Sequence, residues 1–223
     1  MKKYSSKIAE VMALTRIFLI RHGETEWNKL KRLQGHSDVK LSAEGIRQAR
    51  VLSMYAPFQQ LDAFYSSDLA RAVMTAEILA AKFNLPVIKI SGLRETNFGD
   101  WEGKSIVELA TELPNGFKNF FTAPEKCKPP HGETFLQCQA RVMNAIDKII
   151  AAHENQNVVV VSHGAAIRLI ICAALNIPIN KMWSIGQFNA AVNILRVDDG
   201  NFTLELMNGT AHLNRPLNFP LTL

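Results

Sequence analysis

Short continuous runs of apolar residues recur along this chain, with the length and the β-branched content of buried strands. Two runs of four cover 17–20 and 158–161, and further strands are expected at 63–65 and 87–90. Near the end of the chain, runs at 191–197 and 202–207 flank the sequence Asp198-Asp199-Gly200-Asn201. That sequence favours a turn, so the last two runs are predicted to form a hairpin.

Between the expected strands, apolar residues recur three and four positions apart, which is the spacing of one face of a helix. Ser42 is a typical helix N-cap, and Thr134 opens a T-x-x-Q capping box with Gln137. Ser67 and its neighbours are expected to cap another helix. The predicted helices cover about 42–54, 68–79, 134–153 and 165–175.

The alternation of strands and helices predicts an α/β fold of three layers, in which a mostly parallel sheet carries helices on both faces. Residues 16–223 are expected to form one domain, after an N-terminal extension over 1–15 in which Met12 could be an alternative start. Prolines and glycines interrupt the region before residue 133. We expect a lid-like insertion there, at about 104–133, with a short helix near 104–112.

The two longest expected strands end alike, because each runs into a histidine that is followed by glycine. The first continues into Arg21-His22-Gly23 and the second into Ser162-His163-Gly164. Open α/β sheets bind ligands at the carboxyl ends of their strands, and glycine lets a ligand approach the backbone closely. Two imidazoles with an adjoining arginine therefore indicate a site that handles an anion by covalent or acid–base chemistry.

Composition narrows the class of protein. The formal net charge of +5 over 223 residues is too small to indicate nucleic acid, and no apolar stretch approaches the ~20 residues of a membrane span. Cys127, Cys138 and Cys172 are odd in number and widely spaced, which argues against a disulfide framework or a structural zinc site. A cytoplasmic protein is therefore expected, with no nucleic-acid or membrane partner.

Blocks around two histidines, an arginine and a glutamate follow one another in an order that resembles the histidine phosphatase superfamily, which includes the cofactor-dependent phosphoglycerate mutases. In chain order they are LIRHGETEWN from Leu19, LQGHSD from Leu33, LSAEG from Leu41, YSSDLARA from Tyr65, LRE from Leu93, FGDWEG from Phe98 and VSHG from Val161. Such a series is far more specific than an isolated RHG. It implies a phosphoglycerate mutase-like fold.

The resemblance implies roles for five residues: His22 as nucleophile, Glu95 as proton donor, and Arg21, Arg71 and His163 as phosphate-binding groups. Four more are expected at the phosphate pocket by the same resemblance: Asn28, Gln34, Gly35 and Gly164. Asn28 is expected either to hold His22 in its working tautomer or to donate to a phosphate oxygen.

The chemistry of these residue types agrees with those roles. A neutral imidazole nitrogen is nucleophilic at pH 7, and its attack on phosphorus would give a phosphohistidine. Charge on the three non-bridging oxygens would be stabilised by arginine, whose planar fork binds phosphate in bidentate fashion. A carboxylic acid would protonate the leaving alkoxide. No metal ion and no cofactor is expected, because arginines and histidines supply the positive charge.

Three functions fit this set: a phosphomonoester hydrolase, a phosphoglycerate mutase (an isomerase), and a catalytically silent phosphate-binding protein. The silent reading is the weakest, because all five expected positions are filled. The stretch between Glu95 and His163 is shorter than the insertion that mutases of this family carry, which favours hydrolysis. The block FGDWEG also resembles the phosphatase branch, including α-ribazole phosphatases and broad-specificity phosphatases.

The substrate is expected to be a small phosphorylated metabolite, with α-ribazole 5′-phosphate, sugar phosphates and glyceric acid phosphates all open. Specificity is expected from residues 104–133 and from the loop at 29–40. Four phenylalanines are either a contact for the leaving group or lid packing: Phe117, Phe120, Phe121 and Phe135. Four cationic residues either attract an anionic substrate or form a solvated loop: Lys29, Lys31, Arg32 and Lys40. The oligomeric state, monomer or dimer, is not readable from the sequence.

Overall fold

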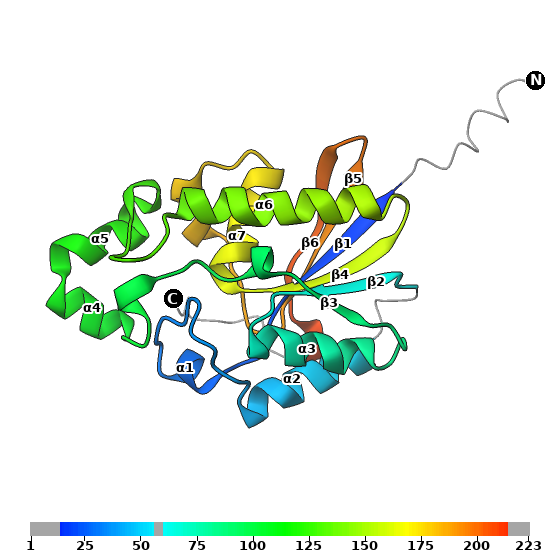
Figure 1. Cartoon of the computed structure of the whole chain (residues 1–223), viewed down its shortest axis with the longest axis horizontal. Coiled ribbons are helices and arrows are strands. Elements are labelled where there is room, and N and C mark those ends of the chain that lie inside the picture. The colour runs from blue at the N-terminus through cyan, green and yellow to red at the C-terminus, as the bar shows by residue number, and fades with distance from the viewer. Residues whose placement is uncertain (1–13, 56–59, 214–223) are drawn as a thin grey trace, which may run out of the picture.

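The computed structural model describes residues 14–55 and 60–213, so Met12 and most of the expected N-terminal extension lie outside the described residues. The described chain is built on a six-stranded sheet (Figure 1). Its strands are β1 (Thr15–Arg21), β2 (Ala63–Ser66), β3 (Val87–Lys89), β4 (Asn157–Ser162), β5 (Val192–Asp198) and β6 (Asn201–Gly209). The first strand thus begins at Thr15, inside the stretch that was expected to be an extension.

Strand order across the sheet is β3-β2-β4-β1-β5-β6. The first four of these strands pair in parallel, whereas β5 pairs antiparallel with β1, and β6 antiparallel with β5. The mostly parallel sheet and the terminal hairpin are therefore confirmed. Because β1 and β4 are parallel neighbours with Arg21 opposite Ser162, the residues that follow both strands emerge side by side.

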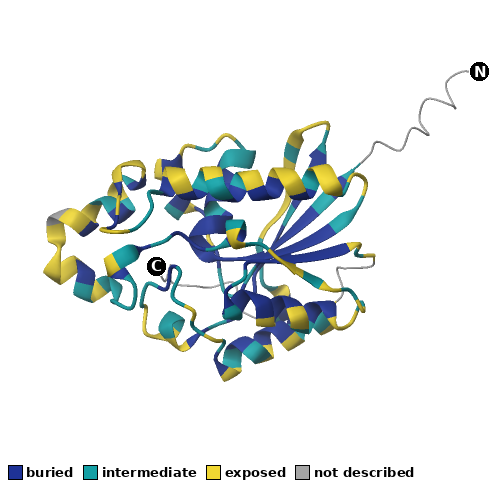
Figure 2. Ribbon diagram, viewed as in Figure 1, coloured by how far each residue is buried: buried dark blue, intermediate teal, exposed yellow. Residues whose placement is uncertain are grey.

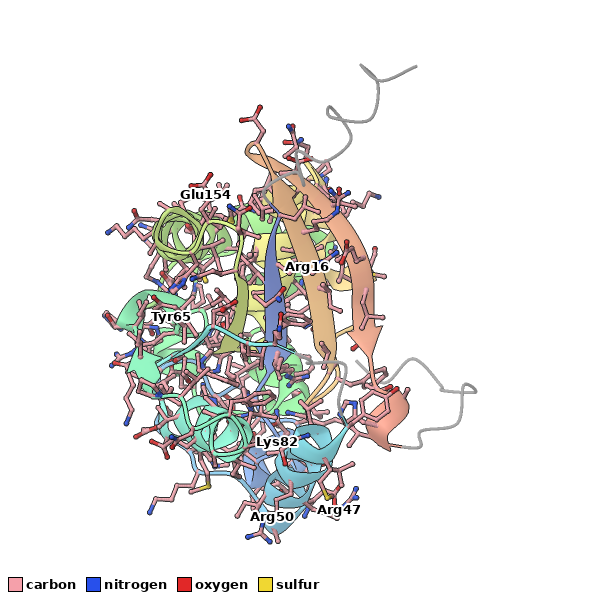
Figure 3. All side chains as sticks on the ribbon, turned by 90° about the vertical axis from the view of Figure 1, so that its right-hand side faces the viewer. Arg16, Arg47, Arg50, Tyr65, Lys82 and Glu154 are labelled. Carbon is pink, nitrogen blue, oxygen red and sulfur yellow. The ribbon has the colours of Figure 1, made fainter. Side chains whose placement is uncertain are left out.

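Seven α-helices are described: α1 (Glu26–Lys29), α2 (Ala43–Met54), α3 (Ala70–Ala80), α4 (Ile106–Glu112), α5 (Pro114–Thr122), α6 (Phe135–Ala152) and α7 (Gly164–Ala174). Helices α6 and α7 lie on one side of the sheet, and α2 and α3 on the other (Figure 1). Arg47 and Arg50 project from the outer surface of α2 (Figure 3). The expected three-layer α/β fold is confirmed.

Side chains of β1 alternate between two hydrophobic clusters, one on each face of the sheet. Ile17 and Leu19 pack in the larger cluster, which contains buried residues of α6 and α7. Phe18 and Ile20 pack in the smaller one with residues of α2 and α3. The central strands are buried on both faces (Figure 2), which explains their continuous apolar runs.

The helix caps agree with the sequence in two cases and differ in one. The Ser42 hydroxyl accepts from the N–H of Gly45, and Thr134 forms the expected capping box with Gln137. Ser67, however, is not the N-cap of α3, whose N-cap is Leu69 without a side-chain hydrogen bond. The N–H of Ala70 donates instead to Asp38 Oδ1 at 2.7 Å, so a distant residue replaces the local cap.

Residues 104–133 contain more helix than expected. The predicted short helix is α4, but α5 follows it directly, and a 3-10 helix (Pro124–Lys126) comes after that. Pro114 stands at the start of α5, where its missing N–H costs nothing. Phe117 and Phe120 of α5 are buried in the larger cluster. This packing stabilises a helix that the sequence did not indicate, because proline and glycine occur in it.

No helix among residues 14–55 and 60–213 is both long and apolar enough to cross a membrane.

Candidate active site

The two histidines that follow β1 and β4 meet at the carboxyl end of the sheet. The N–H of His22 donates to the carbonyl oxygen of Ser162 at 3.0 Å, which continues the β1–β4 pairing by one residue. The ring centroids of His22 and His163 are 5.2 Å apart. Both side chains are buried, with 3% and 0% of their surface exposed. The parallel strands therefore bring the two imidazoles into one site.

The tautomer of His22 is fixed by its neighbour in the chain. His22 Nδ1 lies 2.7 Å from the carbonyl oxygen of Gly23. Because a carbonyl only accepts, Nδ1 carries the proton and donates, and Nε2 keeps its lone pair. The carbonyl of Gly23 therefore fixes the tautomer of His22, which was one of the two roles expected of Asn28. The Asn28 Oδ1 accepts instead from the N–H of Thr25 at 3.0 Å.

Burial keeps both imidazoles neutral. It is the main cause that lowers the pKa of His22 well below 6.5, and Arg71 and then Arg21 lower it further. The pKa of His163 is lowered in the same way, first by burial and then by Arg71. A neutral His22 with a free lone pair at Nε2 is the nucleophilic form.

Arg71 lies in the first turn of α3 with its side chain fully buried. Its Nη1 donates to the carbonyl of Ser37 at 2.8 Å and its Nη2 to the carbonyl of Gly35 at 2.7 Å. Burial is the main cause that lowers the pKa of Arg71 to about 10, so the guanidinium is charged at neutral pH. Carbonyl oxygens orient this cation without neutralising it.

Three buried nitrogens of the site have no hydrogen-bond partner among the described residues: Arg71 Nε, His163 Nδ1 and His163 Nε2. Buried polar atoms without a partner are costly and rare in folded proteins. Their grouping around His22 is what a site needs if it is to receive the oxygens of an anion.

Glu95 reaches the same site from the loop before α4. Its Oε2 accepts from the N–H of Ala165 at 3.0 Å, and its Oε1 accepts from Ala166 at 2.9 Å and Thr96 at 2.9 Å. The first two donors belong to the first turn of α7. The carboxyl group is thereby held beside His163, the N-cap of α7.

Two charged residues that the sequence analysis passed over hold this frame. Glu102 accepts from the N–H groups of His36 and Ser37 at 2.8 Å each, and so fixes the loop whose carbonyls hold Arg71. Arg141 of α6 donates to the carbonyls of Arg94 and Glu95, at 3.0 and 3.1 Å. Glu102 lies within the FGDWEG block, whereas nothing local in the sequence marks Arg141.

Gly35 is required by this loop geometry. Its φ of +51° lies in the left-handed region, and an added Cβ would lie 1.9 Å from Glu102 Oε1. A side chain at this position would strain the backbone and push Glu102 away from the loop.

A cavity of about 900 Å³ opens in front of the histidines. Its lining includes most of the residues expected at the site: Arg21, His22, Asn28, Gln34, Gly35, Arg71, Glu95 and Gly164. His163 is not part of the described lining, but its ring packs against that of His22. The structure therefore brings together all nine residues that the sequence placed at the site, on segments more than 100 positions apart.

The sequence analysis left open the roles of four cationic residues and four phenylalanines, and the structure divides each group. Lys31, Arg32, Phe120 and Phe121 line the cavity. Lys29 instead forms ion pairs with Glu24 and Glu26, and Phe117 and Phe135 are buried in the larger cluster. Other lining residues were not singled out by the sequence analysis, among them Arg168 and Trp183.

The buried neutral histidines make stability depend on pH. The pKa of His22 and His163 is lowered in the folded state, so below about pH 6.5 the unfolded chain binds more protons. The free energy of unfolding should fall as pH decreases through this range, by up to about 1.4 kcal/mol per pH unit for each histidine. Denaturant unfolding between pH 7.5 and 5.0, in buffers without phosphate, measures this slope.

In His163→Asn, the free energy of unfolding should fall less steeply as pH decreases, because one of the two buried histidines no longer contributes. His131→Asn is the matched control, because the His131 side chain is 84% exposed. A slope that is identical in the wild type and His163→Asn would contradict the prediction.

Comparison with known proteins places these residues in a family context. The model of the histidine phosphatase superfamily (branch 1) matches residues 17–210. Phosphoserine phosphatase 1 of Hydrogenobacter thermophilus is 34% identical over 200 residues, which cover 90% of this chain and 95% of that protein.

Two solved structures are similar over nearly their full length. A phosphoserine phosphatase from Entamoeba histolytica, solved as a mutant with phosphoserine, has a TM-score of 0.81 and 31% identity, covering 89% of this chain and 99% of its own. The α-ribazole phosphatase from Shigella flexneri has a TM-score of 0.78 and 30% identity, covering 87% of this chain and 96% of its own. The phosphoglycerate mutase-like fold expected from the sequence is confirmed.

Proposed function

The chain belongs to the histidine phosphatase superfamily, and on that premise we propose that it hydrolyses small phosphomonoesters through a phosphohistidine formed at His22. The observation that carries the proposal is the buried cluster around His22. It combines an imidazole held neutral, two guanidinium groups, and three buried nitrogens that lack partners among the described residues.

In the first step, His22 Nε2 attacks phosphorus, the new N–P bond forms and the ester O–P bond breaks. Arg21, Arg71 and His163 would bind the non-bridging oxygens, whose charge is spread over the equatorial plane of the transition state. Glu95 would give its proton to the leaving alkoxide. The alcohol departs and leaves a phosphohistidine and a Glu95 carboxylate.

In the second step, the Glu95 carboxylate takes a proton from water as the water oxygen attacks phosphorus. The N–P bond breaks, inorganic phosphate leaves, and His22 and Glu95 return to their starting protonation states. Proton donor and acceptor are the same group used in opposite directions, as in other two-step transfers. Asn28 and Gln34 line the cavity beside this centre and would donate to the phosphate as well.

A cavity of about 900 Å³ suits a small metabolite. The named relatives act on phosphoserine and on α-ribazole phosphate, and substrates of that size are the ones we propose for this chain. A cytoplasmic location is part of the proposal, and the three buried, unbridged cysteines support it.

A panel of phosphomonoesters with released phosphate as the readout tests the proposal. We expect multiple turnovers on at least one small ester in that panel. Incubation of 3-phosphoglycerate with a trace of the bisphosphate separates hydrolysis from isomerisation. Fast formation of 2-phosphoglycerate without phosphate release would identify a mutase, and no turnover of any ester would indicate a phosphate-binding protein.

A further inference from the structure

A third guanidinium group stands in the cavity beside those assigned to the phosphate. Arg168 lies on α7, one turn after Gly164, and it is not among the residues placed in the phosphoryl-transfer machinery. Arg168 and Arg21 flank Gly164, since an atom of each guanidinium lies 3.4 Å from the point that a Cβ on Gly164 would occupy. Arg168 therefore borders the phosphate site without being one of the groups that surround His22.

The guanidinium of Arg168 is held in place by neutral groups. Its Nε donates to the carbonyl of Ile185 at 2.7 Å, and its Nη1 donates to the carbonyl of Gly164 at 3.1 Å. Its central carbon lies 5.2 Å from the ring centroid of Trp183. These contacts use two of its five N–H groups and fix its plane against the cavity wall.

No ion pair between described residues includes Arg168, whereas Arg32 on the same cavity pairs with Glu108. Burial and then Arg21 lower the pKa of Arg168 to about 10, so it is still charged at neutral pH. Glu95, the single carboxylate on the described cavity wall, acts against this lowering but forms no ion pair with Arg168. A partly buried cation beside a second cation, with no ion pair to a described carboxylate, is unfavourable until an anion binds.

We propose that Arg168 binds a carboxylate on the leaving group, so that the preferred substrates are phosphomonoesters of small hydroxy or amino acids. The inference rests on the proposed function and narrows it. A phosphate dianion bound by Arg21 and Arg71 would lie beside Arg168, and a second negative charge would give Arg168 the ion pair that it lacks among the described residues. A carboxylate supplies that charge, and its two oxygens match the planar fork.

The part of the cavity wall next to Arg168 bears on the group that would connect the two anions. Trp183, Phe120 and Phe121 give it an apolar aromatic surface next to Arg168. The side chains of Phe120 and Trp183 pack with ring centroids 4.8 Å apart. Between the phosphate ester and the carboxylate, such a surface suits a short carbon skeleton better than a heavily hydrated skeleton.

The test uses substrate pairs that differ at the carboxylate. Phosphoserine is compared with phosphoethanolamine, which lacks it, and 3-phosphoglycerate with glycerol 3-phosphate, which has a hydroxymethyl group in its place. We expect kcat/KM of the wild type to favour the carboxylate member of each pair. Arg168→Gln should lower kcat/KM for the carboxylate members by about 10- to 100-fold, and by less than about threefold for the others.

Arg168→Lys keeps the charge without the fork and should retain part of the preference. Arg50→Gln, which removes the same charge from the exposed surface of α2, should change nothing (Figure 3). If Arg168→Gln does not fold, the wild-type enzyme alone decides the test. A kcat/KM for the carboxylate member that is no higher than that for its partner overturns the inference.

Other outcomes overturn the inference but leave the proposed function standing. An equal loss on both members of a pair, with weaker inhibition by inorganic phosphate, would place Arg168 in the phosphate site. A loss confined to bisphosphates would make the second anion a phosphate. Failure of the proposed function looks different, because the wild type would then release phosphate from no ester, with or without a carboxylate.

Discussion

Replacement of His22 by alanine is expected to lower kcat for phosphate release by roughly 10⁴- to 10⁶-fold, the range seen when a hydrolase loses its covalent nucleophile. His22 has a neutral ring, a proton fixed on Nδ1 by the carbonyl of Gly23, and a lone pair on Nε2. His22 is the one histidine on the described cavity lining, and His163 packs against it. The side chain should therefore be irreplaceable for the first step.

A trapping experiment makes this prediction specific to the covalent step. Brief reaction with a ³²P-labelled ester, followed by alkaline quenching, should leave an acid-labile label that peptide mapping assigns to His22. The label should be missing in His22→Ala and present in His131→Ala, the matched control at an exposed histidine. Unchanged activity in His22→Ala, or a label on another residue, would contradict the assignment.

Glu95→Gln is expected to lower kcat for alkyl phosphates by about 10²- to 10⁴-fold, which is the usual contribution of a general acid. With p-nitrophenyl phosphate the loss should be much smaller, because nitrophenolate leaves without a proton. Steady-state rates on both esters measure the difference. Glu77→Gln, at an exposed carboxylate of α3, is the control and should leave both rates unchanged.

The comparison of leaving groups separates proton transfer from positioning. Glu95 also holds the N–H groups of Ala165 and Ala166 at the start of α7, so its replacement could displace that helix end. A displaced helix would slow both esters by the same factor. Equal losses would therefore assign Glu95 a positioning role and remove it from the proposed proton-transfer step.

Sequence patterns predicted the structure correctly where the residues that indicate it lie close together in sequence. The runs at 17–20 and 158–161 predicted buried strands because every side chain in them packs, and β1 and β4 are indeed buried on both faces. The rule that parallel strands end at one edge then predicted that His22 and His163 meet. Capping at Ser42 and Thr134 was predictable because donor and acceptor are three residues apart.

Prediction failed where a distant residue supplies the partner. The start of α3 depends on Asp38, which lies 32 positions before Ala70, so the local candidate Ser67 was misleading. Helix α5 forms although proline and glycine interrupt its sequence, because Phe117 and Phe120 are buried in the main cluster. In both cases tertiary contacts outweigh the local signal.

By itself, the sequence determined the layers of the fold, because these follow from the periodicity of apolar residues along the chain. Its motifs also showed the resemblance to the family, and that resemblance indicated the nine residues expected at the phosphate site. Only the tertiary structure decided how the site is held and how it is completed. Glu102, Arg141 and Arg168 act through carbonyls or N–H groups of segments far from them in sequence. The physical reason is that the role of a charged side chain depends on the groups around it in space, and only the folded chain brings those groups together.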